Sequence, residues 1–232
     1  KHIPCEGPSA AAVERVRASL GATRRPLWLA ASTHAAEERD VLEAHTQRRR
    51  THPGLLLLLA PRHPRRGDSV AKLAATRGLR VAQRALGDHA GDDCDVYVCD
   101  TLGELPALYA VAGIAFVGGS LAPLGGHNLL EATRMRCAVL HGPHVEANRT
   151  TANALAATTP PEAFCIRDAA SLADGVGRLL GDERLLEASR RAAADAAERL
   201  GRGVLANMLP LIREALRLER GEWRALAAGG GR

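Results

Sequence analysis

The repeated alternation of short apolar runs with helix-like patterns most constrains how this chain folds. Apolar runs occupy residues 27–32 (LWLAAS), 55–60 (LLLLLA), 95–100 (DVYVCD), 114–119 (IAFVGG) and 137–143 (CAVLHGP). Because these runs lack strict alternation, they are typical of strands buried on both faces of a parallel sheet, with helices as crossovers. The order predicts the α/β class, with a doubly wound, Rossmann-like parallel sheet.

The two ends of the chain extend this prediction. A helix is expected to end near Gly21, and residues 164–166 are expected to form the last strand. Two long helical patterns, residues 187–200 and 204–223, come before an AAGGGR tail that indicates fraying. With no internal repeat and no clear linker, we expect residues 1–232 to form one domain with C-terminal helices.

Composition narrows the class of function. Apolar residues make up 46% of the chain, enough for a sizeable core although aromatics are only 3%. The 31 basic and 26 acidic side chains give a net charge of +5, but the excess is scattered arginine. Without a basic stripe interleaved with aromatics, no role with nucleic acid is expected. A weak attraction to anionic lipid headgroups stays open.

Cysteine usage and hydropathy indicate the setting. The cysteines are five in number and form no CxxC pair, so neither a disulfide framework nor a zinc ribbon is predicted, and a reducing compartment is favoured. No apolar run approaches the ~20 residues that cross a bilayer. The chain opens at KHIPCEGPSA without a start Met, so we expect a piece of a longer protein.

Ligands of open parallel sheets bind beyond the carboxyl ends of the strands, so the turns after the predicted strands are the candidate sites. The turn Ser32-Thr33-His34 has two interpretations. With a Glu about three residues later it is typical of a capping box, and its hydroxyls and amides also suit an anion. Both interpretations are compatible.

The next two turns differ in how much they indicate. Pro61 and Pro64 fix the backbone around Arg62, which favours phosphate or carboxylate binding, although a solvated surface arginine is the plain alternative. His63 is interpreted as a structural hydrogen-bonding residue. The turn at residues 100–104 (DTLGE) allows a ligand close to its glycine, but it is equally an ordinary helix start.

The stretch GGSLAPLGGHNLLE, residues 118–131, carries the strongest signal. Its two glycine pairs would let the main chain approach a ligand, and free amides there would hold a phosphate. Asn128 and Glu131 share one helix face, where Glu131 would accept hydrogen bonds from ribose hydroxyls and His127 would donate to the phosphate. A tight turn with a capped helix is the alternative. The stretch matches neither GxxxxGKS/T nor GxGxxG, which disfavours a triphosphate or dinucleotide site.

The missing motifs leave a nucleotide-phosphate cradle without a catalytic base. Neither HExxH nor GxSxG occurs, so hydrolase chemistry has little support. WLAASTHAAEERDVLEAH, LLLLLAPRHPRR, DTLGELPALY and FVGGSLAPLGGHNLLEATRMRCAVLHGPHVEANR resemble, in order and spacing, the C-terminal lobe of the 3-deoxy-D-manno-octulosonic acid (Kdo) transferases of lipid A assembly. The resemblance implies that residues 1–232 form the CMP-Kdo-binding lobe of a glycosyltransferase B fold, without its N-terminal acceptor lobe.

The family implies inverting transfer of Kdo from CMP-Kdo to a lipid A precursor (lipid IVA), without a metal or another cofactor. The catalytic base would lie in the missing lobe, so this chain alone is expected to bind CMP weakly and to transfer nothing. The expected partners are CMP-Kdo, the lipid A precursor, the N-terminal lobe and a peripheral membrane contact. Bacterial relatives imply the cytoplasmic face of the inner membrane, and plant or algal relatives imply a mitochondrion.

The turns and the resemblance together assign a set of residues to the substrate: Ser32, Thr33, Pro61, Arg62, Thr101, Leu102, Gly103, Gly118, Gly119, Ser120, Gly125, Gly126, His127, Asn128, Leu129, Leu130 and Glu131. The chain departs from the family pattern where STHxGEE and GGHNPLEP would have Gly and Pro, since it has Ala36, Leu129 and Ala132. Two alternatives remain: a UDP-sugar transferase or epimerase of the same fold, and a nucleotide-binding module without catalysis.

Overall fold

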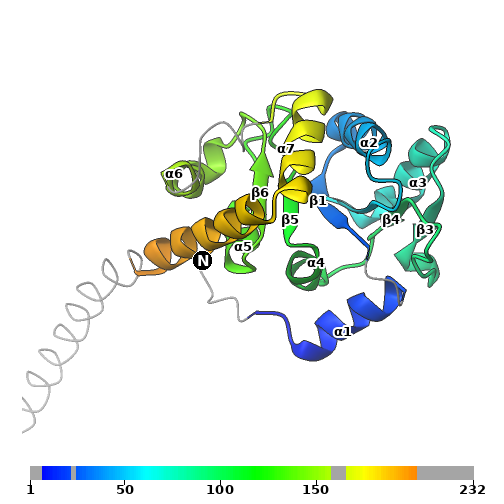
Figure 1. The fold of residues 1–232 in the computed structure, drawn as a ribbon, viewed down its shortest axis with the longest axis horizontal. Coiled ribbons are helices and arrows are strands. Elements are labelled where there is room, and N and C mark those ends of the chain that lie inside the picture. The colour runs from blue at the N-terminus through cyan, green and yellow to red at the C-terminus, as the bar shows by residue number, and fades with distance from the viewer. Residues whose placement is uncertain (1–6, 22–24, 158–165, 203–232) are drawn as a thin grey trace, which may run out of the picture.

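A six-stranded sheet, parallel in every strand pair, lies at the centre of the computed structural model, which describes residues 7–21, 25–157 and 166–202 (Figure 1). The strand order is β3-β4-β2-β1-β5-β6. The strands are β1 (Leu27–Thr33), β2 (Leu56–Pro61), β3 (Val81–Gln83), β4 (Val96–Val98), β5 (Ile114–Val117) and β6 (Ala138–His141).

Helices cover both faces of this sheet, which confirms the doubly wound prediction. One core cluster packs α1 (Ala10–Ser19), α4 (Leu105–Ala112), α5 (Leu129–Arg134), α6 (Arg149–Ala156) and the helical residues 183–202 against one face. The other cluster packs α2 (Ala35–Arg49), α3 (Gly67–Ala75) and α7 (Ala169–Gly181) against the opposite face. Figure 1 shows α1 and α4 on one side of β1, with α2 and α7 on the other. Short 3-10 turns are η1 (Pro64–Arg66), η2 (Arg84–Leu86) and η3 (Glu146–Asn148).

Burial on both faces explains the continuous apolar strands. Trp28 and Ala30 of β1 enter one core cluster, whereas Leu29 and Ala31 enter the other, because successive side chains of a strand point to opposite faces. The four leucines of β2 divide between the clusters in the same way. Each fully buried leucine contributes about 1.5–3 kcal/mol relative to an exposed one, so the strand resists any one-residue slip in register.

The strand order places a topological switch point between β1 and β5. From central β1 the chain runs to β2 on one side, and it returns to pair β5 on the other. The two strands align Ala31 with Val117 near their carboxyl ends. In open α/β sheets, this is where ligands bind.

Several expectations at the ends of elements can be compared with the structure. Helix α1 ends at Ser19, close to the expected Gly21, and the helical residues 183–202 contain the first predicted C-terminal pattern. The second pattern, the tail and residues 164–165 lie outside the described residues, and Ile166 is in no strand. The sequence did not predict β3, since a strand of 3 residues has no recognisable period.

Candidate functional site

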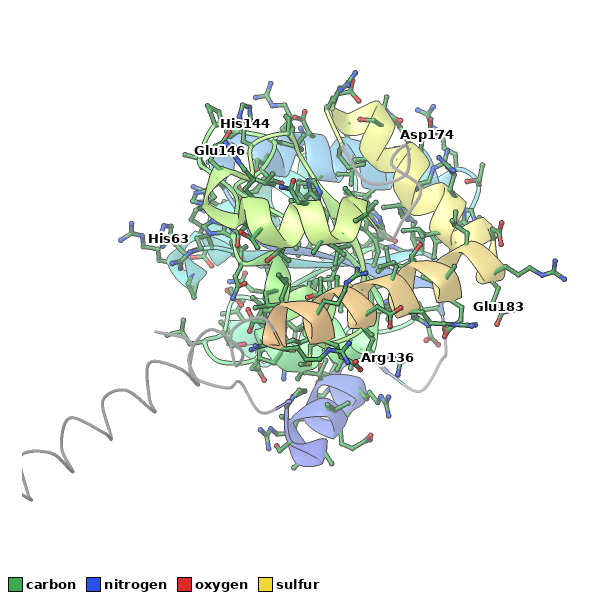
Figure 2. The ribbon with its side chains drawn as sticks, turned by 90° about the vertical axis from the view of Figure 1, so that its left-hand side faces the viewer. His63, Arg136, His144, Glu146, Asp174 and Glu183 are labelled. Carbon is green, nitrogen blue, oxygen red and sulfur yellow. The ribbon has the colours of Figure 1, made fainter. Side chains whose placement is uncertain are left out.

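The predicted turns follow neighbouring strands of the sheet. They leave the carboxyl ends of β4, β2, β1 and β5, which lie next to one another in that order. The structure therefore brings to one edge the residues that the sequence singled out. Figure 2 shows His63, beyond β2, on the same side of the molecule as His144 and Glu146, beyond β6. Glu183 lies on the opposite side.

A close backbone contact joins the turns after β1 and β5. The N–H of Gly118 donates to the carbonyl of Ala31 at 2.8 Å. A Cβ on Gly118 would lie 2.6 Å from the carbonyl oxygen of Ser32, so only glycine fits. Ser32 has φ 55°, and the register with β2 shifts between Ala31 and Thr33. The glycine thus allows close approach, as predicted, but what approaches is β1.

Glu37 is fully buried, and its carboxylate holds the loop after β5. The backbone N–H of Gly119 donates to Oε2 at 2.7 Å, while the N–H groups of Ser120 and Leu121 donate to Oε1 at 2.9 and 2.8 Å. The N–H of His34 also donates to Oε2, at 3.1 Å. Successive amides that converge on one anion form a nest, and here the anion is part of the protein.

The rest of this loop folds back on itself. The N–H groups of Gly126 and His127 donate to the carbonyls of Gly119 and Gly118, at 2.7 and 3.1 Å. The prediction that the glycine amides are free for a phosphate is therefore wrong for Gly118, Gly119 and Gly126. Gly125, with φ 84°, accepts from the N–H of Ala147 at 3.0 Å. The glycines build the loop, and the polar groups left for a ligand are mostly side chains.

A hydrogen-bonded histidine pair spans the switch point. The Nε2 atoms of His34 and His127 are 2.7 Å apart, and their rings stack with centroids 5.0 Å apart. The ring of His63 approaches His34 edge-on, with centroids 6.0 Å apart. Burial lowers the pKa of His127, and the nearby charges of His34 and Arg62 lower it further. An anion bound beside His127 would oppose these effects, because a nearby negative charge raises the pKa of an imidazole.

Neighbouring arginines beyond β2 have different roles. Arg66 donates to the fully buried Glu38 through Nε at 3.1 Å and Nη2 at 2.5 Å. Arg62 is exposed, and its side chain makes no hydrogen bond or ion pair with any described residue. Its backbone N–H is fixed by the carbonyl of Thr33 at 2.9 Å, and Pro61 before it is buried. Arg62 thus has a fixed backbone and a charged side chain without a described ion-pair partner.

The start of α5 carries a carboxylate without a partner. Asn128 caps the helix by accepting from the N–H of Leu130 at 3.1 Å, and Leu129 is fully buried, which confirms the capping interpretation. The half-buried side chain of Glu131 makes no hydrogen bond or ion pair within the described residues. Burial alone raises its pKa. A carboxylate that is partly shielded from solvent and has no described partner favours a ligand that donates hydrogen bonds.

The turn after β4 is held from the side of β3. Arg84 donates to Glu104 through Nη2 at 2.7 Å, and the hydroxyl of Thr101 donates to the same carboxylate. Between them, Gly103 has φ 81° and Leu102 is 84% exposed. This turn is an ordered edge of the candidate site that presents an apolar side chain.

Two hydroxyl residues of the predicted substrate set, Thr33 and Ser120, are fully buried. The hydroxyl of Ser120 donates to the carbonyl of Val117 at 2.5 Å and accepts from the N–H of Gly142 at 2.8 Å, whereas that of Thr33 has no partner among the described atoms. The expected cap at Ser32 or Thr33 is also wrong. The helix cap is His34, because β1 continues through Thr33.

Glu37 and His34 belong to the candidate site but are not among the residues predicted for it. The available signal was a Glu three residues after His34 and followed by a second Glu, at positions where a surface helix would expose them. Both acids are instead fully buried. Across the part of the chain that the structure describes, His, Cys, Asp and Glu form no group of three suited to a metal ion, and no helix is long and apolar enough for a membrane span.

Comparisons with known proteins find homologues of one kind. A probable mitochondrial 3-deoxy-D-manno-octulosonic acid transferase of Arabidopsis thaliana is 35% identical over 188 residues, covering 80% of this chain and 42% of the relative. The transferase of Bordetella pertussis is 42% identical over 151 residues, covering 62% of this chain and 35% of the relative. The chain is a homologue of the Kdo transferases. It spans well under half the length of these relatives.

A solved structure places the homology in one domain of those enzymes. The C-terminal CMP-Kdo binding domain of WaaA from Acinetobacter baumannii superposes with a TM-score of 0.69 at 27% identity, covering 80% of this chain and all of that domain. The Kdo transferase resemblance and the glycosyltransferase B lobe are thus confirmed. No protein-family model matches the chain.

Proposed function

We propose that this chain is the donor-binding half of a Kdo transferase and receives CMP-Kdo at the carboxyl edge of the sheet. The observation that carries the proposal is two charged groups at the switch point that have no hydrogen-bond or ion-pair partner among the described residues: the guanidinium of Arg62 and the carboxylate of Glu131. Such a cation and anion suit a ligand with a phosphate and hydroxyl donors. The homologous domain of WaaA is described as CMP-Kdo binding, which supports this choice of ligand.

Each group has a distinct role toward the donor. Arg62 and the histidine pair meet the single phosphate, because Arg62 lies near enough to His127 to lower its pKa. Glu131 accepts hydrogen bonds from the ribose hydroxyls, which replace the solvent that burial has removed. The exposed turn Thr101-Leu102-Gly103 lines the nucleotide pocket. The other predicted residues beyond β1, β2 and β5 complete the donor site.

Transfer would require a second lobe. The proposed reaction is inverting transfer of Kdo from CMP-Kdo to a lipid A precursor, lipid IVA, with the catalytic carboxylate on an N-terminal lobe. Charge that develops on the CMP leaving group would be met by Arg62 and the histidine pair, which removes the need for a metal. The acceptor, the N-terminal lobe and a peripheral membrane contact belong to the whole enzyme. Its proposed location is the cytoplasmic face of the inner membrane in a bacterium, or the mitochondrion in a plant or alga, and the plant relative is named mitochondrial.

Titration calorimetry of the 232-residue chain tests the donor site. CMP should bind, and UDP should bind more weakly. Glu131→Ala should weaken CMP binding by about 1–3 kcal/mol, because ribose hydroxyls would lose their buried acceptor. Glu146→Ala, an exposed carboxylate beyond β6, is the matched control. Preference for UDP would favour the UDP-sugar alternative, and unchanged affinity in the Glu131 variant would refute the assignment of the ribose contact.

A further inference from the structure

One buried carboxylate ties together the two turns at the switch point. Oε2 of Glu37 accepts from the backbone N–H groups of His34 and Gly119, and Oε1 accepts from those of Ser120 and Leu121. A carboxylate offers about four acceptor sites, so its capacity is filled. One donor lies in the turn after β1, and the others lie in the loop after β5.

The loop transmits this constraint to the donor site. Its carbonyls at Gly118 and Gly119 receive the N–H groups of His127 and Gly126, so the two sides of the loop are pinned together. A Cβ on Gly119 would lie 2.8 Å from Cδ2 of His127, which shows how closely the ring packs on the backbone that Glu37 holds. Asn128 and the first turn of α5 follow directly.

The same carboxylate also fixes the other histidine. His34 is the N-cap of α2, and its N–H donates to Glu37 three residues later. The two rings that meet at 2.7 Å therefore stand on backbone segments that share one anion. If that anion is lost, each segment gains freedom, and the Nε2 atoms lose their alignment.

We propose that Glu37 is a positioning residue for the nucleotide donor: it sets the His34–His127 pair and the start of α5 in the geometry that receives the phosphate. The binding part of this inference rests on the proposed function. Glu37 has no contact with the donor in this role. It acts through the two histidines and the loop.

The chain offers graded variants and a matched control. In Glu37→Gln the volume is kept, but the new NH2 group must face N–H donors on one side of the nest. Glu37→Asp keeps the charge and shortens its reach by one methylene. Glu43→Gln makes the same chemical change on the same helix, at an exposed carboxylate that accepts from Gln47 and from no other described residue.

The first measurement is an NMR experiment that requires no ligand. With 15N-labelled histidine, the wild-type chain should show a scalar coupling between the Nε2 atoms of His34 and His127 across their hydrogen bond. Glu37→Gln should abolish the coupling and Glu43→Gln should retain it. A purely structural role, distributed over the core, would lower the unfolding temperature and leave this coupling intact.

The second measurement is the affinity for CMP, determined by calorimetry on the same samples. Glu37→Gln should weaken CMP at least about tenfold, whereas Glu43→Gln should stay within about twofold of the wild type. A folded Glu37→Gln protein that keeps the coupling, or that loses it with CMP affinity unchanged, overturns the inference. If Glu37→Gln does not fold, Glu37→Asp decides by the same two readings. If the wild type binds no CMP, the proposed function fails, and the coupling alone decides whether Glu37 positions the pair.

Discussion

Glu37 and Glu131 occupy the same position in two helices that flank the switch point, yet their environments are opposite. Each lies three residues after its helix cap, Glu37 after His34 and Glu131 after Asn128. Glu37 is fully buried and receives backbone N–H groups from both turns. Glu131 is half-buried, its carboxylate receives no hydrogen bond within the described residues, and its pKa is raised by burial.

The difference separates two roles: Glu37 stabilises the backbone of the candidate site, whereas Glu131 is available to bind a ligand there. A filled acceptor has nothing left for a ligand, and its removal strands buried donors. An acceptor without a hydrogen-bond donor at a ligand-binding edge slightly lowers the stability of the ligand-free protein, and it forms hydrogen bonds when a ligand supplies the donors. The same helix position therefore supports two roles, and the loop beside it decides which role is taken.

Replacing each acid by alanine should separate these roles most strongly. Glu37→Ala leaves buried backbone N–H groups unpaired and should lower the free energy of unfolding by about 4 kcal/mol. Glu131→Ala should change it by less than about 1 kcal/mol, because no hydrogen bond or ion pair among the described residues is lost. Urea unfolding of both variants measures the contrast, and equal losses would show that the two acids have equivalent structural roles.

The two arginines beyond β2 repeat the contrast with opposite charge. Arg66→Ala leaves Glu38 buried without its cation and should destabilise the chain by about 3 kcal/mol. Arg62→Ala should alter stability by less than about 0.5 kcal/mol, since its side chain is exposed and unpaired. CMP affinity should fall in the Arg62 variant. Chemical denaturation and CMP titration of both variants test the contrast. It would be contradicted if Arg62→Ala unfolded at a lower denaturant concentration than Arg66→Ala.

The smallest expected effect is the pH dependence that Glu131 contributes. Its pKa in the folded chain is raised, so the folded state binds this proton more readily than the unfolded state does. The contribution of Glu131 to stability therefore improves as the pH falls from neutral through the raised pKa. Glu131→Gln should be slightly more stable than the wild type at neutral pH, by less than about 1 kcal/mol, and the difference should vanish in acid. A difference that grows on acidification would contradict the burial of this carboxylate without a partner.

Much of the fold could be predicted because buried strands appear in the sequence as short continuous apolar runs. The leucines of β2 and the run IAFV of β5 can be buried only between two layers of helices. By contrast, β3 has only 3 residues and depends on its pairing with β4, which no local pattern reveals. The helix cap moved to His34 because a register shift near Ser32 lets β1 continue for another residue.

The position of the candidate site on the sheet could be predicted from the sequence, but the hydrogen bonds within it could not. The glycines of residues 118–126 and the polar turn ends indicated which edge of the sheet matters. That Glu37 fills the amides after β5 depends on β1 and β5 pairing in register, a contact between residues 82 positions apart. No spacing rule within one turn encodes such a contact. Glu131 was found because its neighbours mark a helix start, whereas its lack of partners emerges only in three dimensions.

The most direct test of the account is to follow the backbone amides of the chain by NMR as CMP is added. The account predicts the largest shifts at Arg62 and at residues 127–131, where the phosphate and the ribose of CMP are proposed to bind. Amides near Asp95, which precedes β4 at the opposite edge of the sheet, should not move. An absence of shifts with saturating CMP, or shifts confined to the edge at Asp95, would contradict a donor site at the switch point.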